Sequence, residues 1–190
     1  MSAFPVHTLQ SAPEKSRSGL QTLQAAFGFI PNIAASMASS PVLIDSLVGL
    51  FKNVHGGSFS EQQIQTVLLT NAVTNRSAYP VALHTALGLN EHLDPADVEA
   101  IRAGGLPKDP KLAALSRLAR TLIEKRGHLS REDQERFLAA GFGPDLLLEV
   151  VAIVAASTIT NYTANVTAPP LESHFQDHAW NAPAHPTTRE

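Results

Sequence analysis

The sequence contains no cysteine, and this absence excludes every function that depends on a thiol. No disulfide can cross-link the chain, no thiolate can bind zinc, and no pair of thiols can be oxidised and reduced in turn. Charged residues are also scarce, at 16% of the 190 positions, with a net charge of −3 and no run of basic residues. Nucleic-acid binding therefore has no electrostatic support.

Long apolar runs are absent as well. The longest, Leu146 to Ile159, is interrupted by Glu149 and is shorter than a bilayer-spanning helix requires. The first fifteen residues lack the basic start and apolar core of a secretory signal. We therefore expect a soluble, cytoplasmic protein without a membrane partner.

Apolar residues, at 44% of the chain, recur at the spacing typical of α-helices, and no segment alternates apolar and polar residues over the length of a strand. Proline and glycine separate the helical segments. The pattern predicts an all-α fold with helices at about 19–29, 32–37, 41–55, 60–75, 78–88, 95–103, 110–126, 130–140 and 144–163.

The length of the chain is that of one domain. We expect residues 1–18 to form an N-terminal arm, residues 19–168 to form the domain, and residues 169–190 to form a C-terminal tail. The last helix, which starts at Pro144, is apolar on nearly every side, so we expect other elements to surround it.

Two predicted helices at the centre of the sequence form the segment around which the chain is organised. The first begins after a capping box, because Ser60 and Gln63 can each satisfy a backbone amide of the other. Pro80 is tolerated only in the first turn of a helix, so the second helix starts close before it. Gly88 is expected to end this helix. His84 then lies one turn in from its start.

Four polar residues are expected to meet where these helices join: Gln65, Ser77, Tyr79 and His84. His84 is the candidate general acid or base, because an imidazole titrates near neutral pH. Ser77 lies at the mouth of the second helix, where exposed amides favour a capping side chain or a bound anion. Tyr79 and Gln65 can hydrogen-bond to a ligand. Each also has a structural interpretation, as a buried histidine, a helix cap, a core tyrosine or a neutral amide.

This segment resembles the core of the carboxymuconolactone decarboxylase and alkylhydroperoxidase D-like family, in its peroxidase-related branch. Members of that branch carry a glutamate in the first helix and then Cys-x-x-Cys-x-x-x-His at the turn. The cysteine positions fall here on Ser77 and Pro80, the glutamate on Gln65 and the histidine on His84. The thiol-free decarboxylase branch has an acidic residue one turn before its histidine, and that position is again Pro80. Neither pattern is complete.

The resemblance covers roughly residues 10–172. It includes Phe-Gly-Phe-Ile-Pro-Asn at 27–32, the helix starts at Asp109-Pro110 and Leu129-Ser130, and an Ala-Gly-Phe before the last apolar helix. It implies an all-helical alkylhydroperoxidase D-like domain that associates with itself as a dimer, trimer or hexamer. The family reduces peroxides with a thiolate and a resolving thiol, so that activity is not expected here.

Three functions remain open. The first is binding of a small organic acid or lactone-like molecule, with His84 as acid or base and the helix mouth at Ser77 holding an anionic group. The second is a non-catalytic binding or scaffold protein. The third is a hydrolase in which His84 activates Ser77, although no acidic partner for the histidine is near in sequence and only a distant residue such as Glu149 is available.

The remaining histidines are given no role. His174 and His178 in the tail have the spacing of two metal ligands on a helix but lack a third ligand, and His185 lies among polar residues and prolines. His55 precedes two glycines and is expected in a loop. No metal or cofactor is expected, and the predicted partners are a small-molecule ligand and further copies of the chain.

Overall fold

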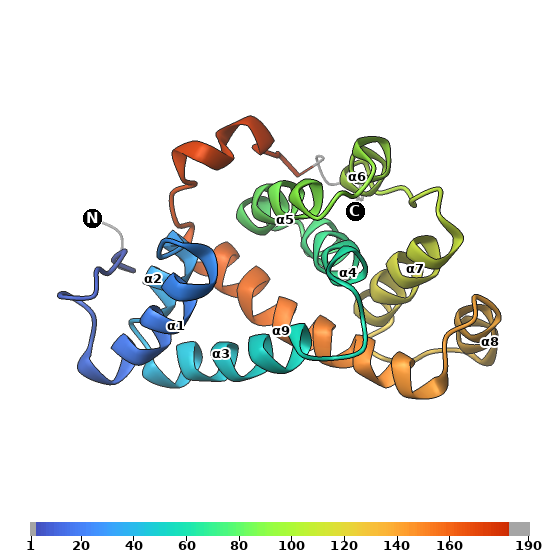
Figure 1. Ribbon diagram of the computed structural model, residues 1–190, viewed down its shortest axis with the longest axis horizontal. Helices are drawn as coiled ribbons and strands as arrows, with labels where there is room; N and C mark the ends of the chain where they lie inside the picture. The colour runs from blue at the N-terminus through green and yellow to red at the C-terminus, as the bar shows by residue number, and fades with distance from the viewer. Residues whose placement is uncertain (1–2, 183–190) are drawn as a thin grey trace, which may run out of the picture.

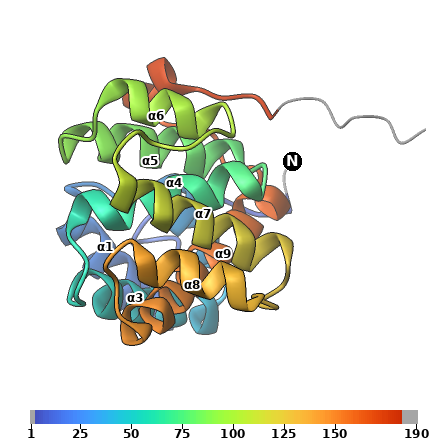
Figure 2. The same cartoon turned by 90° about the vertical axis from the view of Figure 1, so that its right-hand side faces the viewer.

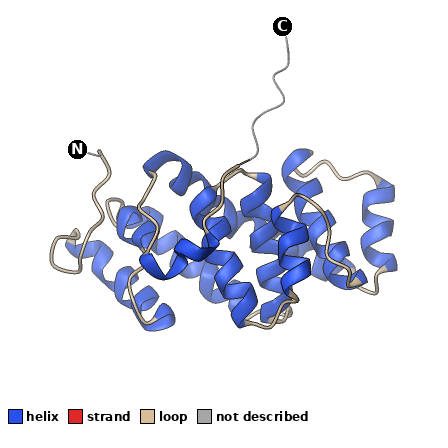
Figure 3. Cartoon of the chain, turned by 90° about the horizontal axis from the view of Figure 1, so that it is seen from above, coloured by secondary structure: helices blue, strands red, loops and turns tan. Residues whose placement is uncertain are grey.

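The computed structural model describes residues 3–182 and consists of helices joined by short turns (Figure 1). Helices are the regular structure throughout this described part, which confirms the predicted all-α class (Figure 3). The α-helices are α1 (Arg17–Phe27), α2 (Asn32–Met37), α3 (Pro41–His55), α4 (Glu61–Thr74), α5 (Ala78–Asn90), α6 (Pro95–Arg102), α7 (Pro110–Glu124), α8 (Arg131–Ala139) and α9 (Pro144–Thr167). Two short 3-10 helices are η1 (Glu14–Ser16) and η2 (Ser173–His178).

Five helices begin at a side chain that accepts a hydrogen bond from an amide of the first turn: Ser40, Ser60, Asp94, Asp109 and Ser130. Such caps satisfy backbone donors that have no partner inside the helix. The capping box predicted at the start of α4 is present in both directions. The predicted helix starts at these positions are confirmed.

One predicted boundary is wrong. Helix α5 does not end at Gly88 but continues to Asn90, with Gly88 buried inside it. A Cβ atom on Gly88 would lie 2.9 Å from Cδ1 of Leu93. This glycine therefore allows close packing against Leu93 and does not provide a left-handed helix end.

Helices α4 and α5 lie side by side at the centre of the molecule, and α9 runs across below them (Figures 1 and 2). Helix α4 also contacts α3, α6 and α7. Its residues 64–72 are buried on every side, including the polar ones. Because neighbouring helices pack around α4, the side chains of its first and second turns are held in fixed positions. These side chains can therefore contribute to a site.

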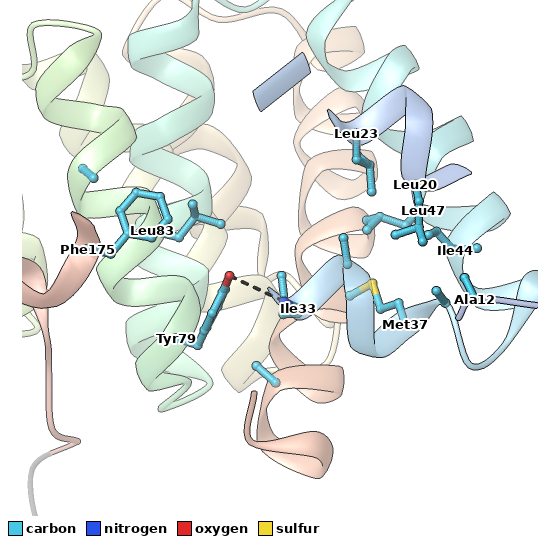
Figure 4. Packing of buried hydrophobic residues seen from close by; sticks show 14 residues of the cluster. Ala12, Leu20, Leu23, Ile33, Met37, Ile44, Leu47, Tyr79, Leu83 and Phe175 are labelled. Atoms are coloured by element: carbon cyan, nitrogen blue, oxygen red, sulfur yellow. Dashed lines mark hydrogen bonds between the residues drawn. The ribbon is translucent and has the colours of Figure 1, made fainter. Parts of the chain in front are cut away.

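Segments before α1 and after α9 pack onto this helical body. Ala12 is buried, and the buried Ser16 hydroxyl donates to the carbonyl oxygen of Ala38 at 2.7 Å. Near the other end, Phe175 is buried against α5 in the same cluster as Leu83 (Figure 4). Parts of the predicted arm and tail thus contribute to the hydrophobic core. His185 lies outside the described residues.

Helix α9 is only partly enclosed, although we expected it to be surrounded. One side packs against α2, α3, α4, α5 and α7. On the other side, Leu148, Tyr162 and Val166 are 69%, 59% and 66% exposed. By length and composition alone, its 24 residues could also cross a membrane, a criterion that core helices of soluble proteins meet too.

Candidate functional site

A cavity of about 260 Å³ lies between α1, α3, α4, α5 and α9, next to the start of α2. Most of its wall is apolar, with side chains that include Leu23, Phe27, Leu47, Phe51, Leu68 and Leu87. Its ionisable or amide groups are His55, Glu61, Gln65, His84 and Glu91. An apolar cavity with a few convergent polar groups is the usual form of a small-molecule site, and this volume suits a ligand smaller than most drugs.

His84 and Gln65 meet in the cavity wall, as the sequence predicted. Nδ1 of His84 lies 3.0 Å from Oε1 of Gln65, and both side chains are buried. With the Gln65 amide in this orientation, Nδ1 carries the proton and Nε2 keeps a lone pair. Among the described residues, Nε2 of His84 has no hydrogen-bond partner. The imidazole is therefore held by one nitrogen and can accept a hydrogen bond at the other.

The environment keeps the His84 imidazole uncharged. Burial, followed by the positive charge that His55 can carry, lowers the pKa of His84 to about 3. The sequence-based expectation that this side chain titrates near neutral pH is wrong, because an imidazolium in this position would lose its hydration without gaining a carboxylate. Gln65 is neutral and cannot compensate such a charge.

Sequence reasoning missed a second imidazole in the same cavity. His55 is the last residue of α3, and its ring packs on Phe51 with a centroid distance of 4.2 Å. Its Nδ1 lies 2.9 and 3.0 Å from the two carboxylate oxygens of Glu61, the first residue of α4. We refer to these two residues as the His55–Glu61 pair. The sequence contained a signal for this pair, because a histidine at the end of one helix precedes an acidic residue at the start of the next. The two glycines after His55 suggested instead that it lies in a loop.

Ser77 lies outside the cavity wall. Its side chain is fully buried at the start of α5, and its hydroxyl donates to the backbone carbonyl of Asn161 in α9 at 3.1 Å. The predicted side-chain cap is wrong, since Ser77 occupies the N-cap position without capping α5 through its hydroxyl. The anion site expected there does not open into the cavity. Glu149, the distant acid considered for a hydrolase, instead accepts a hydrogen bond from the amide of Ser58 at 2.6 Å.

Tyr79 also lies outside the cavity wall, where it connects three distant segments. Its hydroxyl donates to Oε1 of Glu172 at 2.8 Å, and the amide of Ile33 at the start of α2 approaches the same hydroxyl (Figure 4). Oε1 of Glu172 also accepts from the amide of Asn32 at 2.6 Å. Burial and the Glu172 carboxylate raise the pKa of Tyr79 well above its usual value. This tyrosine therefore joins the C-terminal segment to α2 and α5.

The tail histidines form no metal site within residues 3–182, where no group of three or more potential ligands occurs. The ring of His174 packs instead between aromatic side chains, 4.7 Å from the Phe29 centroid and 4.2 Å from that of Phe175. His174 thus has a packing role in the structure.

No protein-family model matches the sequence, and no curated protein matches it either. Solved structures do. An uncharacterised peroxidase-related protein from Ralstonia eutropha JMP134, described as an alkylhydroperoxidase AhpD core, is 19% identical, with 92% of this chain and 94% of that chain covered and a TM-score of 0.80. A peroxidase-related protein from Silicibacter sp. TM1040 is 16% identical, with 91% and 92% covered and a TM-score of 0.76.

The debrominase Bmp8, in a variant with one cysteine replaced by alanine and in complex with 2,3,4-tribromopyrrole, is 15% identical to this chain. The comparison covers 94% of this chain and 96% of that chain, with a TM-score of 0.74. The fold is thus not limited to proteins described as peroxidases. At these identities the likenesses establish architecture, and each spans nearly the whole of both chains. The chain therefore has the alkylhydroperoxidase D-like fold of peroxidase-related proteins, without a cysteine at any position.

Proposed function

We propose that the chain binds a small, mainly apolar molecule of the lactone or organic-acid class in the cavity, with His84 as the polar group that contacts it. The observation that carries this proposal is the pairing of His84 with Gln65, which holds Nδ1 and leaves Nε2 for a ligand. Apolar side chains make up most of the surrounding wall and would bury the ligand body.

The charges around the cavity favour an uncharged ligand. Glu61 and Glu91 are in its wall, and the neutral His84 offers no counter-charge to an ionised acid. A lactone or the protonated form of a weak acid fits this environment better than a carboxylate. The complex of Bmp8 with 2,3,4-tribromopyrrole is consistent with this size and polarity, because that ligand is a small apolar ring with one N–H group.

The reaction in this proposal is independent of thiols, because peroxide reduction by the family's route needs two of them and the chain has none. His84 would accept a hydrogen bond from the ligand at Nε2. The hydrolase alternative has less support, since Ser77 donates to Asn161 and lies outside the cavity wall. No specific observation favours the scaffold alternative.

Calorimetric titration with pantolactone, a small and mainly apolar lactone with one hydroxyl group, tests the binding proposal. We expect measurable binding to the unmodified chain and at least tenfold weaker binding to His84→Gln, because about 1.4 kcal/mol would be lost with the hydrogen bond that the ligand hydroxyl donates to Nε2 of His84. His128→Gln is the matched control, since His128 is exposed and distant in sequence from the cavity residues. Equal affinity of both variants, or no heat with the unmodified chain, would refute the proposal.

We also propose that the exposed side of α9 contacts a second copy of the chain. Leu148, Ala155 and Tyr162 recur at seven-residue spacing and are exposed, and Val166 continues this side four residues later. Such a stripe is typical of helices that pack against another helix. A cytoplasmic location, and the absence of nucleic-acid and membrane partners, stay predictions from the sequence.

Light scattering after size-exclusion chromatography tests this contact. Leu148→Lys should lower the apparent mass, because it places a charge in the stripe. Leu138→Lys, at an exposed position of α8, is the control and should leave the mass unchanged. A monomeric mass for the unmodified chain at all concentrations would contradict self-association.

A further inference from the structure

The cavity contains two imidazoles that are held in the same way by one helix. Glu61 and Gln65 are four residues apart and therefore lie one above the other on the same face of α4. Glu61 binds Nδ1 of His55, and Gln65 binds Nδ1 of His84. Both rings line the same cavity, so both can offer their second nitrogen to a single ligand.

The two imidazoles differ in the group behind them. His55 has a carboxylate at Nδ1, whereas His84 has a neutral amide. A carboxylate at Nδ1 fixes the tautomer, with the lone pair on Nε2, and stabilises the positive charge that the ring acquires on taking a proton. Glu61 is itself the first residue of a helix, where the backbone favours a negative charge.

We propose that His55, oriented by Glu61, is the proton-transfer residue of the cavity, and that His84 and Gln65 position the ligand. This inference rests on the proposed function, because it assigns a chemical role within the same binding site. Among the described residues, Nε2 of His55 and the amide nitrogen of Gln65 have no hydrogen-bond partner. The site thus combines a base with a carboxylate behind it and an amide donor for a ligand oxygen.

The reaction that these groups support is an allylic proton shift in a lactone. Nε2 of His55 removes a proton from the carbon beside the carbonyl, the C–H electron pair forms a double bond to the carbonyl carbon, and the carbonyl π pair moves onto oxygen, where the Gln65 amide can stabilise it. The resulting imidazolium, paired with Glu61, returns the proton to the far end of the conjugated system. The double bond moves, and no oxidant, reductant or further reactant is consumed.

The titratable groups near His55 belong to three helices or their ends. Glu61 lies on α4, His84 lies on α5 and Glu91 directly follows its last residue, and Lys52 is an exposed residue one turn earlier on α3. His84 is uncharged across the working pH range, because its pKa is about 3. Glu61 is the carboxylate in contact with the His55 ring. Its removal should therefore slow proton transfer more than removal of Glu91.

The test is conversion of α-angelica lactone to its conjugated isomer, followed by proton NMR in D₂O, where transfer also introduces deuterium. We expect His55→Gln to lower the rate at least 100-fold, in the range of general-base catalysis. Glu61→Gln preserves the size and shape of the side chain and should lower the isomerisation rate by less than His55→Gln does. The loss should appear in kcat with KM unchanged, since the imidazolium formed during the reaction loses its counter-charge while the contacts to the lactone remain. His128→Gln should match the unmodified chain.

The outcomes separate this inference from the binding proposal. Loss of binding in His84→Gln together with an unchanged isomerisation rate in His55→Gln would overturn the role of His55 alone. Binding of the lactone without isomerisation by the unmodified chain would do the same. Absence of binding would refute the proposed function and this inference with it. Circular dichroism of each variant establishes that the fold is retained, and Glu61→Gln tests the role even if His55→Gln unfolds.

Discussion

The first turn and the second turn of α5 were expected to form one site, yet the structure gives them different roles. At the first turn, Ser77 and Tyr79 are buried and bonded to Asn161 and Glu172. One turn later, His84 lines a cavity and keeps a free ring nitrogen. In this chain, the polar side chains of the first turn of α5 therefore serve packing, and the proposed ligand chemistry belongs to the histidine and its neighbours.

The largest effect should come from the tail segment that covers the first turn. Phe175→Ala removes a buried ring from the core cluster that contains Leu83 and Tyr79, and should cost about 3–5 kcal/mol of unfolding free energy. Urea denaturation measures this loss. A loss below 1 kcal/mol would show that the tail is not part of the core.

Tyr79→Phe should cost about 1.5–3 kcal/mol, because a hydrogen bond to a partly buried carboxylate is lost. The chain offers a matched control, since its other tyrosine, Tyr162, is exposed and its change to phenylalanine should stay within about 0.5 kcal/mol. Lactone binding should not change in either variant. Weaker lactone binding by the Tyr79→Phe variant would show that this tyrosine is part of the binding site.

These two regions also show what the sequence could predict. Helix starts follow from local capping residues such as Ser60 and Asp109, and the Gln65–His84 contact follows from helical spacing across a short turn. The bonds of Ser77 and Tyr79 go to residues 84 and 93 positions away in the sequence, so no local pattern reveals them. The contact of His55 with Glu61 was missed because a loop position was expected for His55 before the two glycines, whereas it is the last residue of α3.

The pH dependence of stability should distinguish the two turns as well. The pKa of His84 is about 3 in the folded chain, against 6.5 as the ordinary value, so the unfolded chain binds more protons below pH 6.5. Stability therefore falls as the pH drops from 6.5 towards 3, by about 2 kcal/mol between pH 7 and pH 5 from this group. His84→Gln should remove this contribution. The account would be contradicted if the free energy of unfolding changed with pH in the same way in the unmodified chain and in His84→Gln.

Ser77→Ala should have the smallest effect. It removes one neutral hydrogen bond to the carbonyl of Asn161 and should cost about 0.5–1.5 kcal/mol. A fluorophosphonate probe should not label the unmodified chain at Ser77, because this hydroxyl is buried and bonded to a backbone oxygen. Labelling found by mass spectrometry would revive the hydrolase alternative.

The central claim is that the cavity end of α5, and not its first turn, binds the ligand. Imidazole ¹⁵N NMR spectra recorded during titration with α-angelica lactone test it most directly. The account predicts that the signals of His84 and His55 shift while those of His174 and His178 stay in place. Unchanged signals of both cavity histidines at saturating lactone would contradict it.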